Sequence, residues 1–260
     1  MSVKSPASAL SEHLIRPRWP APANVKAVIT TRGGGCSAAP YDSNNLGLHV
    51  GDQEADVLEN RQLLLAALGL RQPPQWLEQI HGAKVVEALP DGLVRTADGC
   101  YSHQPGVACV VMTADCLPVL LCDRQGRQVA AAHAGWRGLA KGILASTVES
   151  FAADPATIMA YLGPAISVDQ FEVGIEVLEA YCESARSQEQ LEAITAAFRP
   201  SMRPLHFYAD IYALARAELA ALGVRDVYGG DYCTYSEVER FYSYRRESQT
   251  GRMASLIWLV

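Results

Sequence analysis

Two histidines and one cysteine stand in short motifs at the ends of expected strands. His81 belongs to the motif QIHG, Cys116 to TADC and His133 to AHAGWRG. Two imidazole rings and one thiolate are three metal ligands, and three protein ligands with one open position are typical of a catalytic zinc site. A trigonal copper site uses the same ligand set, so the residue types alone leave the metal open. A metal held in this way acidifies a bound water or polarises a substrate atom.

The spacing of Cys116 and His133 predicts that the two residues meet in space. They lie 17 positions apart, with an expected strand on each side of a turn at 124–126. A hairpin of this length returns the chain to its starting end, so residues 116 and 133 should share one end of the sheet. Gly82 and Gly135 stand beside the two histidines and permit a close approach of the backbone.

The same atoms support a second interpretation without a metal. A cysteine whose pKa is lowered by a nearby histidine is a nucleophile for acyl transfer, and Cys116 with His133 would be such a pair. Asp115 would then orient the imidazole ring as the third member of a catalytic triad. The two interpretations differ in geometry. A metal requires both histidines beside the sulfur, whereas a hydrolase needs one histidine on the thiol and a free oxyanion hole.

Three arginines are candidates for binding an anion near these motifs. Arg137 begins an expected helix, where free backbone N–H groups and the helix dipole favour negative charge. Arg32 precedes three glycines, and Arg245 follows the aromatic segment FYSY at 241–244. The other histidines lie away from the motifs, so core or surface positions are expected for His13, His49, His103 and His206.

The hydrophobic pattern predicts strands that roughly alternate with helices. Short β-branched or apolar runs predict strands at 25–31, 107–112, 119–122, 128–132, 158–162, 226–228 and 255–260. Apolar residues at three- and four-residue steps predict helices at 139–151, 173–182 and 211–222, and a further helix that Asp52 caps and Gly69 ends. The hairpin within 119–132 favours an α/β (α+β) fold with mixed sheets over a purely parallel sheet.

The composition excludes several classes of protein. The chain has 260 residues with 22 basic and 28 acidic side chains, and its net charge of −6 argues against a nucleic-acid-binding protein. Its apolar runs are shorter than the ~20 residues of a membrane helix, so no contact with a membrane is expected. Seven cysteines are an odd number in a chain of this size, and they are expected as thiols.

The first 23 residues differ in character from the rest of the chain. They contain four prolines and lack the apolar core of a signal peptide. We expect a flexible N-terminal arm at 1–23, a single domain at 24–260 and a cytoplasmic location.

Several segments carry a resemblance to a known family. They are TTRGGGCSAAPYDSNNLGLHVGD (30–52), LEQIHGAKV (77–85), TADCLPVLLCD (113–123), AAHAGWRG (131–138), LGPAIS (162–167), FEVG (171–174), DYCTY (231–235), and FYSYRR (241–246) with GR (251–252). In these segments, and over nearly everything after residue 24, the chain resembles the YfiH or laccase-domain family. Its members are also called polyphenol oxidase-like proteins and peptidoglycan editing factors.

The resemblance implies a four-layer α/β/β/α fold and a zinc ion at the positions matching His81, Cys116 and His133. It also implies a purine nucleoside phosphorylase that acts on adenosine, inosine and methylthioadenosine, with adenosine deaminase activity alongside. Older naming in the family describes copper-dependent laccases. A multicopper laccase uses on the order of ten histidines. This chain has six, so copper-dependent phenol oxidation is disfavoured and Cu²⁺ is expected only as an adventitious occupant in vitro.

Phosphorolysis needs a phosphate cradle and contacts to the sugar and the base. Arg32, Arg137 and Arg245 are the candidate phosphate ligands, and Asn45 and Gln79 are the candidate partners of ribose or purine. Purine nucleosides and phosphate are then the expected partners. Two alternatives stay open: a cysteine-dependent amide hydrolase or peptidoglycan-precursor editing enzyme, and a metal-binding regulatory protein without turnover.

Overall fold

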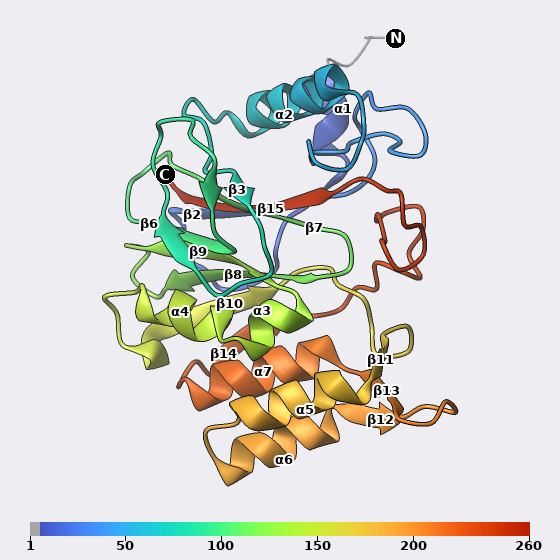
Figure 1. Cartoon of the computed structure of the whole chain (residues 1–260). Helices are drawn as coiled ribbons and strands as arrows, with labels where there is room; N and C mark the ends of the chain where they lie inside the picture. The colour runs from blue at the N-terminus through green and yellow to red at the C-terminus, as the bar shows by residue number, and fades with distance from the viewer. Residues whose placement is uncertain (1–5) are drawn as a thin grey trace.

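The computed structural model describes residues 6–260 and arranges them in four layers: helix, sheet, sheet and helix (Figure 1). Helices α1 (Pro6–Ser11) and α2 (Glu54–Leu68) cover the outer face of the first sheet, and the later helices cover the outer face of the second. Within this described part, no helix combines the length and the apolar character of a membrane span. The α/β fold with mixed sheets that the sequence predicts is confirmed.

The first sheet joins the two ends of the sequence. Its strands are antiparallel and follow the order β1 (Leu14–Ile15), β2 (Val25–Thr30), β15 (Met253–Leu259) and β7 (Cys109–Thr113). Strand β15 comes from the C-terminal part of the chain and lies between β2 and β7. Ile29, Val111 and Ile257 belong to the apolar core between the two sheets, so this sheet depends on contacts between distant segments.

The second sheet is mixed. Its strands follow the order β14 (Asp226–Gly229), β10 (Ile158–Leu162), β8 (Leu117–Asp123), β9 (Val129–Ala134), β6 (Gly99–Ser102) and β4 (Val85–Glu87). The outer pairs, β14 with β10 and β6 with β4, are parallel, and the inner pairs are antiparallel. Helices cover one face and the first sheet covers the other (Figure 1). Burial of both faces explains why the central strands are continuous apolar runs.

Strands β8 and β9 form the hairpin that the sequence predicts. Pro118 pairs with His133, so Cys116, just before β8, lies at the end of the sheet where β9 finishes. Along β8, Leu121 packs toward the helices and Leu120 packs toward the first sheet. Apolar packing on both faces fixes the register of the hairpin and thereby brings residues 116 and 133 together.

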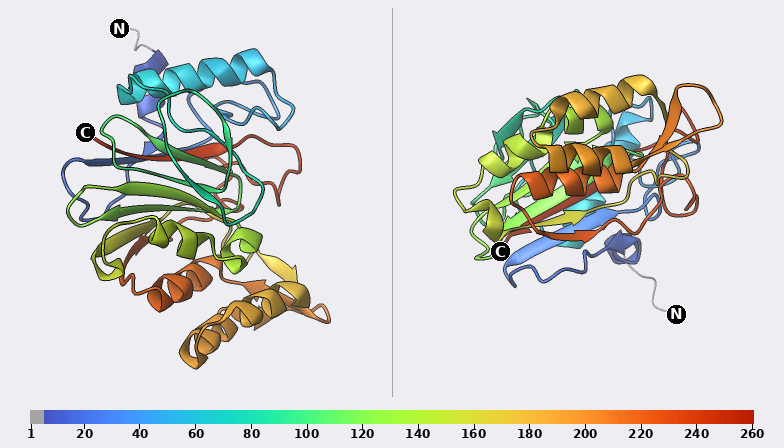
Figure 2. Two further views of the ribbon diagram at one scale, coloured as in Figure 1. Left: turned by 60° about the vertical axis from the view of Figure 1, so that its left-hand side comes forward. Right: turned by 90° about the horizontal axis from the view of Figure 1, so that it is seen from below.

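Five helices and a small sheet complete the layer outside the second sheet. The helices are α3 (Trp136–Ala140), α4 (Ile143–Glu149), α5 (Ile175–Ser184), α6 (Gln188–Ala196) and α7 (Ile211–Ala221), with the 3-10 turn η1 (Pro155–Thr157). The small sheet has the order β11 (Glu172–Gly174), β13 (His206–Ala209) and β12 (Phe198–Pro200). Figure 2 shows α5, α6 and α7 side by side beneath the sheets. A separate parallel pair, β3 (Leu77–Glu78) and β5 (Arg95–Thr96), precedes and follows the segment that contains His81.

The helix expected at 139–151 is broken into α3 and α4. Gly142 lies between the two helices with a φ of 89°, a conformation that suits glycine. Leu139 and Ile143 are both buried in the same apolar core. The apolar periodicity therefore continues across the break, which is why the pattern predicts one helix where the chain forms two.

Helix α2 ends where the sequence predicts but starts differently. Gly69 ends it with a φ of 66°, which is the usual glycine conformation after a helix. The N-cap is Gln53, without a side-chain hydrogen bond, and the expected cap, Asp52, lies one residue earlier. The Asp52 carboxylate accepts hydrogen bonds from the backbone N–H of Gln53 and from Nδ2 of Asn45 instead.

The N-terminal segment is part of the fold from residue 6 onward, which differs from the flexible arm expected at 1–23. Helix α1 packs against α2, and Leu10 is fully buried in the core under these helices. Strand β1 extends the first sheet, and its Ile15 is also buried. Burial removes these apolar side chains from water, and this stabilises the segment. Residues 1–5 of the expected arm lie outside the described residues.

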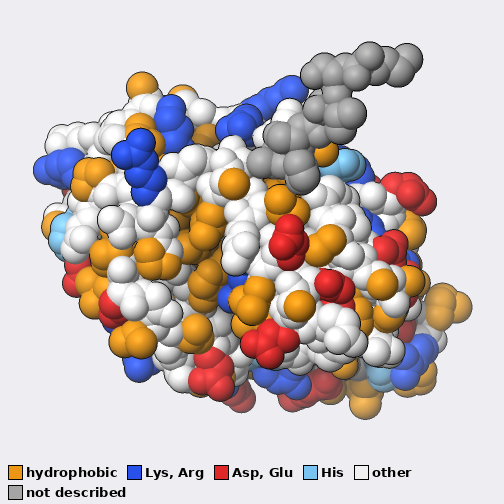
Figure 3. Space-filling view, turned by 90° about the horizontal axis from the view of Figure 1, so that it is seen from above, with side chains coloured by type: hydrophobic (Ala, Val, Ile, Leu, Met, Phe, Trp, Pro, Cys, Tyr) orange, Lys and Arg blue, Asp and Glu red, His pale blue; other side chains and the backbone are white. Residues whose placement is uncertain are grey.

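The face carried by α1 and α2 mixes both kinds of charge. Figure 3 shows basic side chains gathered toward the upper left of this view and acidic side chains spread over much of the rest. Apolar side chains reach the surface between them, as they do on most protein surfaces. On this face, the described residues form no broad surface of a single charge.

Candidate metal centre

His81, Cys116 and His133 converge at the surface of the molecule. Nε2 of His81 lies 3.9 Å from Sγ of Cys116, and the ligand atoms of the three residues lie within 4.8 Å of one another. His81 is exposed, Cys116 is half-buried and His133 is buried, so the group opens to solvent on the His81 side. Among residues 6–260 this is the one group of three such side chains that could hold a metal ion.

Local backbone features let the three side chains approach one another. The β8–β9 hairpin supplies Cys116 and His133, and a turn after β3 supplies His81. The backbone of His81 has a φ of 57°, which is uncommon for a residue with a side chain. A Cβ atom on Gly135 would lie 2.7 Å from Sγ of Cys116, so only glycine leaves room for the sulfur there.

Asp98 holds both histidines and is absent from the residues that the sequence motifs predict. Its fully buried carboxylate lies 2.9 Å from Nδ1 of His133. The same carboxylate accepts hydrogen bonds from three successive backbone N–H groups, those of Ile80 at 3.2 Å, His81 at 2.8 Å and Gly82 at 2.7 Å. This arrangement stabilises the uncommon backbone of His81 and leaves Nε2 of His133 free to face Cys116.

The sequence carries little signal for the role of Asp98. It stands in the segment TADG at 96–99, directly before β6, where a short acidic residue beside a glycine is typical of a turn. Its contacts join positions 35 and 17 residues away, so they become visible only when β6 pairs with β9.

The charges of the site favour a thiolate. Burial raises the pKa of Cys116, but the charge of His133 and hydrogen bonds from both histidines outweigh burial and lower this pKa to about 6. Burial lowers the pKa of His133, whereas the charge of Cys116 and the hydrogen bond to Asp98 raise it to about 9. Near neutral pH the pair is therefore a thiolate beside an imidazolium, and the thiolate is both the nucleophilic and the metal-binding form of cysteine.

Asp115 does not form the triad considered for the metal-free interpretation. Its carboxylate accepts hydrogen bonds from Oγ1 of Thr234 at 2.7 Å, Oγ of Ser243 at 3.0 Å and the backbone N–H of Arg245 at 2.7 Å. Asp98, and not Asp115, contacts the imidazole ring of His133. Asp115 thus anchors the loop around residue 243 next to the segment that carries Cys116.

Two of the candidate phosphate ligands are engaged within the chain. Arg32 donates hydrogen bonds to the carbonyl oxygens of Asp42 at 3.1 Å and Val238 at 3.2 Å, and its guanidinium pairs with the Asp42 carboxylate. Arg245 donates from Nη1 to the carbonyl oxygen of Glu172 at 2.9 Å. The contacts of Arg32 are those of a residue that holds two loops together, and they do not support its expected role on phosphate.

Arg137 is an exposed candidate among the expected phosphate ligands. It lies on the short helix α3, four residues after His133, and its side chain is exposed. Its guanidinium group lies over the ring of Trp136, 4.2 Å from the ring centre. Among the described residues it has no carboxylate partner, so its charge is available to a ligand.

The amides of Asn45 and Gln79 are bound by backbone groups of the chain itself. Asn45 is fully buried, and its Oδ1 accepts hydrogen bonds from the N–H groups of Gly47 and Arg252 at 2.9 Å each. Gln79 donates to the carbonyl oxygen of Met112 at 2.8 Å and accepts from its N–H at 2.7 Å. Their expected contacts with ribose or purine have no support here, because these amides are used to hold the turns around the site.

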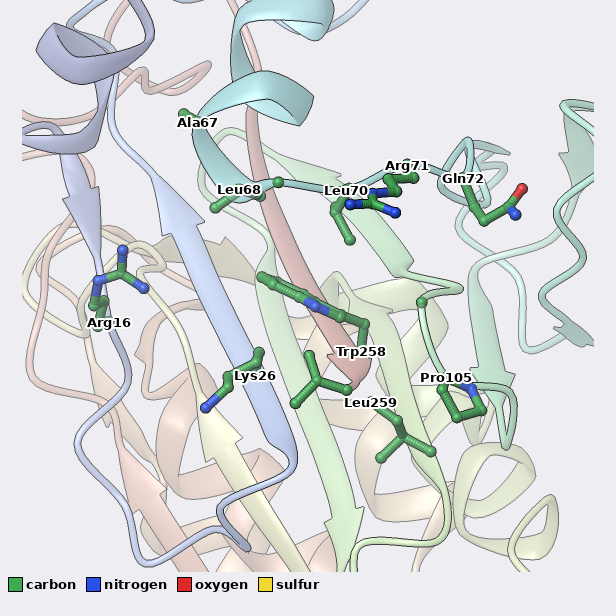
Figure 4. Close-up of a pocket in the computed structure, with 13 residues that line it drawn as sticks. Arg16, Lys26, Ala67, Leu68, Leu70, Arg71, Gln72, Pro105, Trp258 and Leu259 are labelled. Atoms are coloured by element: carbon green, nitrogen blue, oxygen red, sulfur yellow. The ribbon is translucent and has the colours of Figure 1, made fainter.

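A surface pocket of about 530 Å³ lies away from the candidate metal centre, between the end of α2 and the far end of β15 (Figure 4). Arg16, Lys26 and Arg71 surround it, and Trp258 and Leu259 form part of its wall. None of the three candidate metal ligands lines this pocket, so it is separate from the site described above.

Comparisons with known proteins give close relatives over almost the whole chain. A purine nucleoside phosphorylase of Pseudomonas aeruginosa is 54% identical over 245 residues, which cover 94% of this chain and 98% of the relative. The purine nucleoside phosphorylase YfiH of Escherichia coli strain K12 is 51% identical over 248 residues, which cover 95% and 99%. Both matches include the segments that carry His81, Cys116 and His133.

Solved structures and a family model agree with these relatives. A crystal structure of a Neisseria meningitidis protein has a TM-score of 0.89 and 51% identity, covering 95% of this chain and 99% of the other. A Bacillus licheniformis protein named YfiH has a TM-score of 0.83 and 30% identity, covering 91% and 93%. The model of a family described as multi-copper polyphenol oxidoreductase laccase matches residues 26–260. The chain therefore belongs to this laccase-domain family, which includes the YfiH proteins.

Proposed function

We propose that this chain is a zinc-dependent purine nucleoside phosphorylase that acts on adenosine, inosine and methylthioadenosine, with adenosine deamination as a side activity. The observation that carries the proposal is the convergence of His81, Cys116 and His133, with their ligand atoms within 4.8 Å of one another at the surface. The names of the Pseudomonas and Escherichia relatives support a phosphorylase.

The donor set of the site suits zinc. The lowered pKa of Cys116 supplies a thiolate near neutral pH. Asp98 engages Nδ1 of His133, so Nε2 becomes the ligand nitrogen when the incoming metal displaces its proton. Zinc held by these three ligands would supply a Lewis acid that polarises the departing purine. The exposed side of His81 gives a nucleoside access from solvent.

Product analysis with the zinc-loaded protein tests the proposal. Incubation with adenosine and phosphate is expected to release adenine and ribose 1-phosphate, and formation of inosine reports deamination. Cys116→Ser should abolish both reactions. Cys182→Ser removes a half-buried thiol from α5 and should leave both unchanged. A wild-type reaction that yields no adenine would contradict the phosphorylase.

A cysteine-dependent amide hydrolase is the second candidate. One observation favours it: the ring of His133 lies beside Cys116, and the Asp98 carboxylate orients that ring. A thiolate nucleophile, an imidazolium that can protonate the leaving group and an orienting carboxylate are the parts that such a hydrolase requires. The two candidates differ in their dependence on metal. Hydrolysis of amides or peptidoglycan precursors that resists chelators and is abolished by thiol alkylation would favour the hydrolase.

Copper-dependent phenol oxidation has less support, although the family model is described as a laccase. A multicopper cluster needs on the order of ten histidines. The sequence has six, and two of them belong to the group of His81, Cys116 and His133. Copper added in vitro would compete with zinc for the same three ligands.

A further inference from the structure

Two arginines near the segment that leads from β7 to Cys116 carry positive charge without a carboxylate partner. Arg61 lies on α2, Arg252 lies directly before β15, and both side chains are half-buried. Neither forms an ion pair within residues 6–260, although arginines elsewhere in the molecule do so repeatedly. A guanidinium group that is partly removed from water carries a desolvation cost, and an anionic ligand offsets this cost.

The side chain of Arg61 is held in place with donor capacity left over. Its Nε and Nη2 donate to the carbonyl oxygen of Leu46 at 3.0 and 2.8 Å. Its guanidinium group lies over the ring of Trp76, 3.8 Å from the ring centre. Nη1 has no hydrogen-bond partner in the part of the chain that the structure describes. Burial lowers the pKa of Arg61 to about 10, so the group stays charged near neutral pH.

Arg252 is also positioned with free donors. Its backbone N–H donates to Oδ1 of Asn45, and its Nη1 donates to the carbonyl oxygens of Thr250 and Gly251 at 3.0 Å each. Nε and Nη2 have no partner among the described residues. A Cβ atom on Gly47 would lie 2.9 Å from Cγ of Arg252, so the side chain passes close over this glycine.

The two arginines converge on one short loop together with a histidine. Arg61 binds the carbonyl oxygen of Leu46, and Arg252 packs against the adjacent Gly47. His49 follows two residues later. Its pKa is lowered by burial and then by the positive charges of Arg252 and Arg61, so the three groups lie within one another's electrostatic field. The loop thus gathers three basic side chains in a chain whose net charge is negative.

Arg252 connects this group to Cys116. Met253 pairs with Thr113 between β15 and β7, so Arg252 lies level with the segment that leads from Thr113 to Cys116. Burial lowers the pKa of Arg252, and the negative charges of Cys116 and Asp115 oppose that shift. The strand pairing therefore places Arg252 on the side of the molecule where the segment to Cys116 begins, which suits a second substrate bound beside the candidate metal centre.

Arg61 connects the same group to His81. Its Nη2 lies 3.8 Å from Sδ of Met112. The backbone of Met112 is bound by the amide of Gln79, two residues before His81. Arg61 therefore contacts β7, and Arg252 lies level with the end of the same strand, so both arginines lie near the segment that leads to Cys116.

We propose that Arg61 and Arg252, with His49 beside them, form the phosphate-binding subsite of the enzyme. The identity of the anion rests on the proposed phosphorylase function. Phosphate is a compact anion with several acceptor oxygens, and guanidinium groups bind such oxygens through paired N–H donors. Nη1 of Arg61 and Nε with Nη2 of Arg252 provide these donors. This subsite takes the place of Arg32, whose guanidinium is already bound within its own loops.

Titration with inorganic phosphate tests the subsite without turnover. In calorimetry of the full-length, zinc-loaded protein, Arg252→Gln should bind phosphate about 10- to 100-fold more weakly than wild type, because charge-assisted hydrogen bonds are lost. Arg252→Lys keeps the positive charge but lacks the paired N–H donors, so its affinity for phosphate should lie between that of wild type and that of Arg252→Gln. Arg71→Gln is the matched control, because it removes an exposed arginine from the separate pocket of Figure 4.

Two results would overturn the subsite. One is equal phosphate affinity in wild type and Arg252→Gln, and the other is loss of phosphate binding in Arg71→Gln alone, which would place the anion in the separate pocket. If Arg252→Gln does not fold, Arg61→Gln supplies the same comparison from α2, with unaltered near-ultraviolet circular dichroism as the check on folding.

Steady-state kinetics separates this proposal from the phosphorylase itself. In Arg252→Gln the KM for phosphate should rise about 10- to 100-fold, while the KM for nucleoside and the zinc content keep their wild-type values. If wild type binds phosphate through Arg252 but releases no purine, the phosphorylase fails and the anion site stands. If wild type is a phosphorylase and Arg252→Gln has an unchanged KM for phosphate, the subsite alone fails.

Discussion

Asp98 links the two histidines of the candidate metal centre. Its carboxylate binds Nδ1 of His133 and the backbone N–H groups of the turn that carries His81. A carboxylate on the far nitrogen of a metal-binding histidine sets the orientation of the ring and the position of its proton. One buried side chain thus places two ligands at the distance from Cys116 that a shared metal requires.

Asp98→Asn should weaken zinc binding about 10- to 100-fold, because an amide offers one acceptor oxygen where the carboxylate offers two. Competition with a chromophoric chelator measures the affinity. Asp123→Asn is the matched control: Asp123 is also buried and accepts backbone N–H groups, from Arg127 and Gln128, but at the opposite end of the β8–β9 hairpin. An equal loss of zinc affinity in both variants would argue against a specific role for Asp98.

The lowered pKa of Cys116 predicts how the site responds to pH. Above about pH 6 the sulfur is a thiolate, and as the pH falls through this value it gains a proton and loses its affinity for metal. The affinity for zinc should therefore fall as the pH drops through this value, and alkylation of Cys116 in the metal-free protein should slow. Mass spectrometry of the Cys116 peptide after iodoacetamide pulses measures the midpoint. A midpoint near the ordinary thiol pKa of about 8.5 would contradict the thiolate.

The three candidate metal ligands lie at strand ends and in the turn that follows β3. The hairpin of β8 and β9 aligns Cys116 with His133, and the turn after β3 adds His81 from a separate segment. Gly135, directly after β9, leaves the space into which the sulfur of Cys116 fits. The packing of these elements therefore decides whether the three side chains meet.

Gly135→Ala should reduce zinc content, because the added Cβ would lie 2.7 Å from Sγ of Cys116 and would displace the sulfur. Elemental analysis of the purified variant provides the measurement. Gly92→Ala is the comparison: Gly92 lies in an exposed turn with a φ of 71°, so the added Cβ strains the backbone there but has nothing within 4 Å and lies away from the site. Gly92→Ala should keep the zinc content of wild type, and full zinc content in Gly135→Ala would show that the close approach is not required.

The four layers of the molecule bury both faces of each sheet and place the site where the sheets connect. One apolar core lies between the two sheets, a second between the second sheet and its helices, and a third under α1 and α2. The chain crosses from β7 in the first sheet to β8 in the second through the segment that ends at Cys116. The candidate metal centre therefore depends on the stable stacking of both sheets.

Leu10→Ala tests whether the N-terminal segment contributes to this stacking. Leu10 is fully buried in the core under α1 and α2, so its truncation should lower the free energy of unfolding by about 2–5 kcal/mol. Denaturant unfolding followed by circular dichroism measures the change. Met202→Ala, at a fully exposed position, should change the free energy of unfolding by less than about 0.5 kcal/mol. Equal stability of the two variants would contradict the packing of α1.

Local patterns in the sequence were sufficient for much of the fold. The apolar runs of β8 and β9 on either side of the turn at Gly126 predicted the hairpin, and the spacing of Cys116 and His133 predicted that they share one end of it. Strand period and turn chemistry act between near neighbours, so they can be recognised in the order of residues. The sequence did not predict that the expected helix breaks at Gly142, because the spacing of apolar residues continues without interruption across this position.

Only the tertiary structure decided which hydrogen-bond partners the polar side chains of the site have. Asp98, and not Asp115, holds His133. The amide oxygens of Asn45 and Gln79 accept hydrogen bonds from the N–H groups of Arg252 and Met112, which lie far along the sequence. A residue type states which hydrogen bonds a side chain can make, whereas distance and direction decide which of them form. Buried polar groups need hydrogen-bond partners inside the molecule. Which partners are within reach depends on how the sheets and helices pack against one another, and the order of residues does not show this.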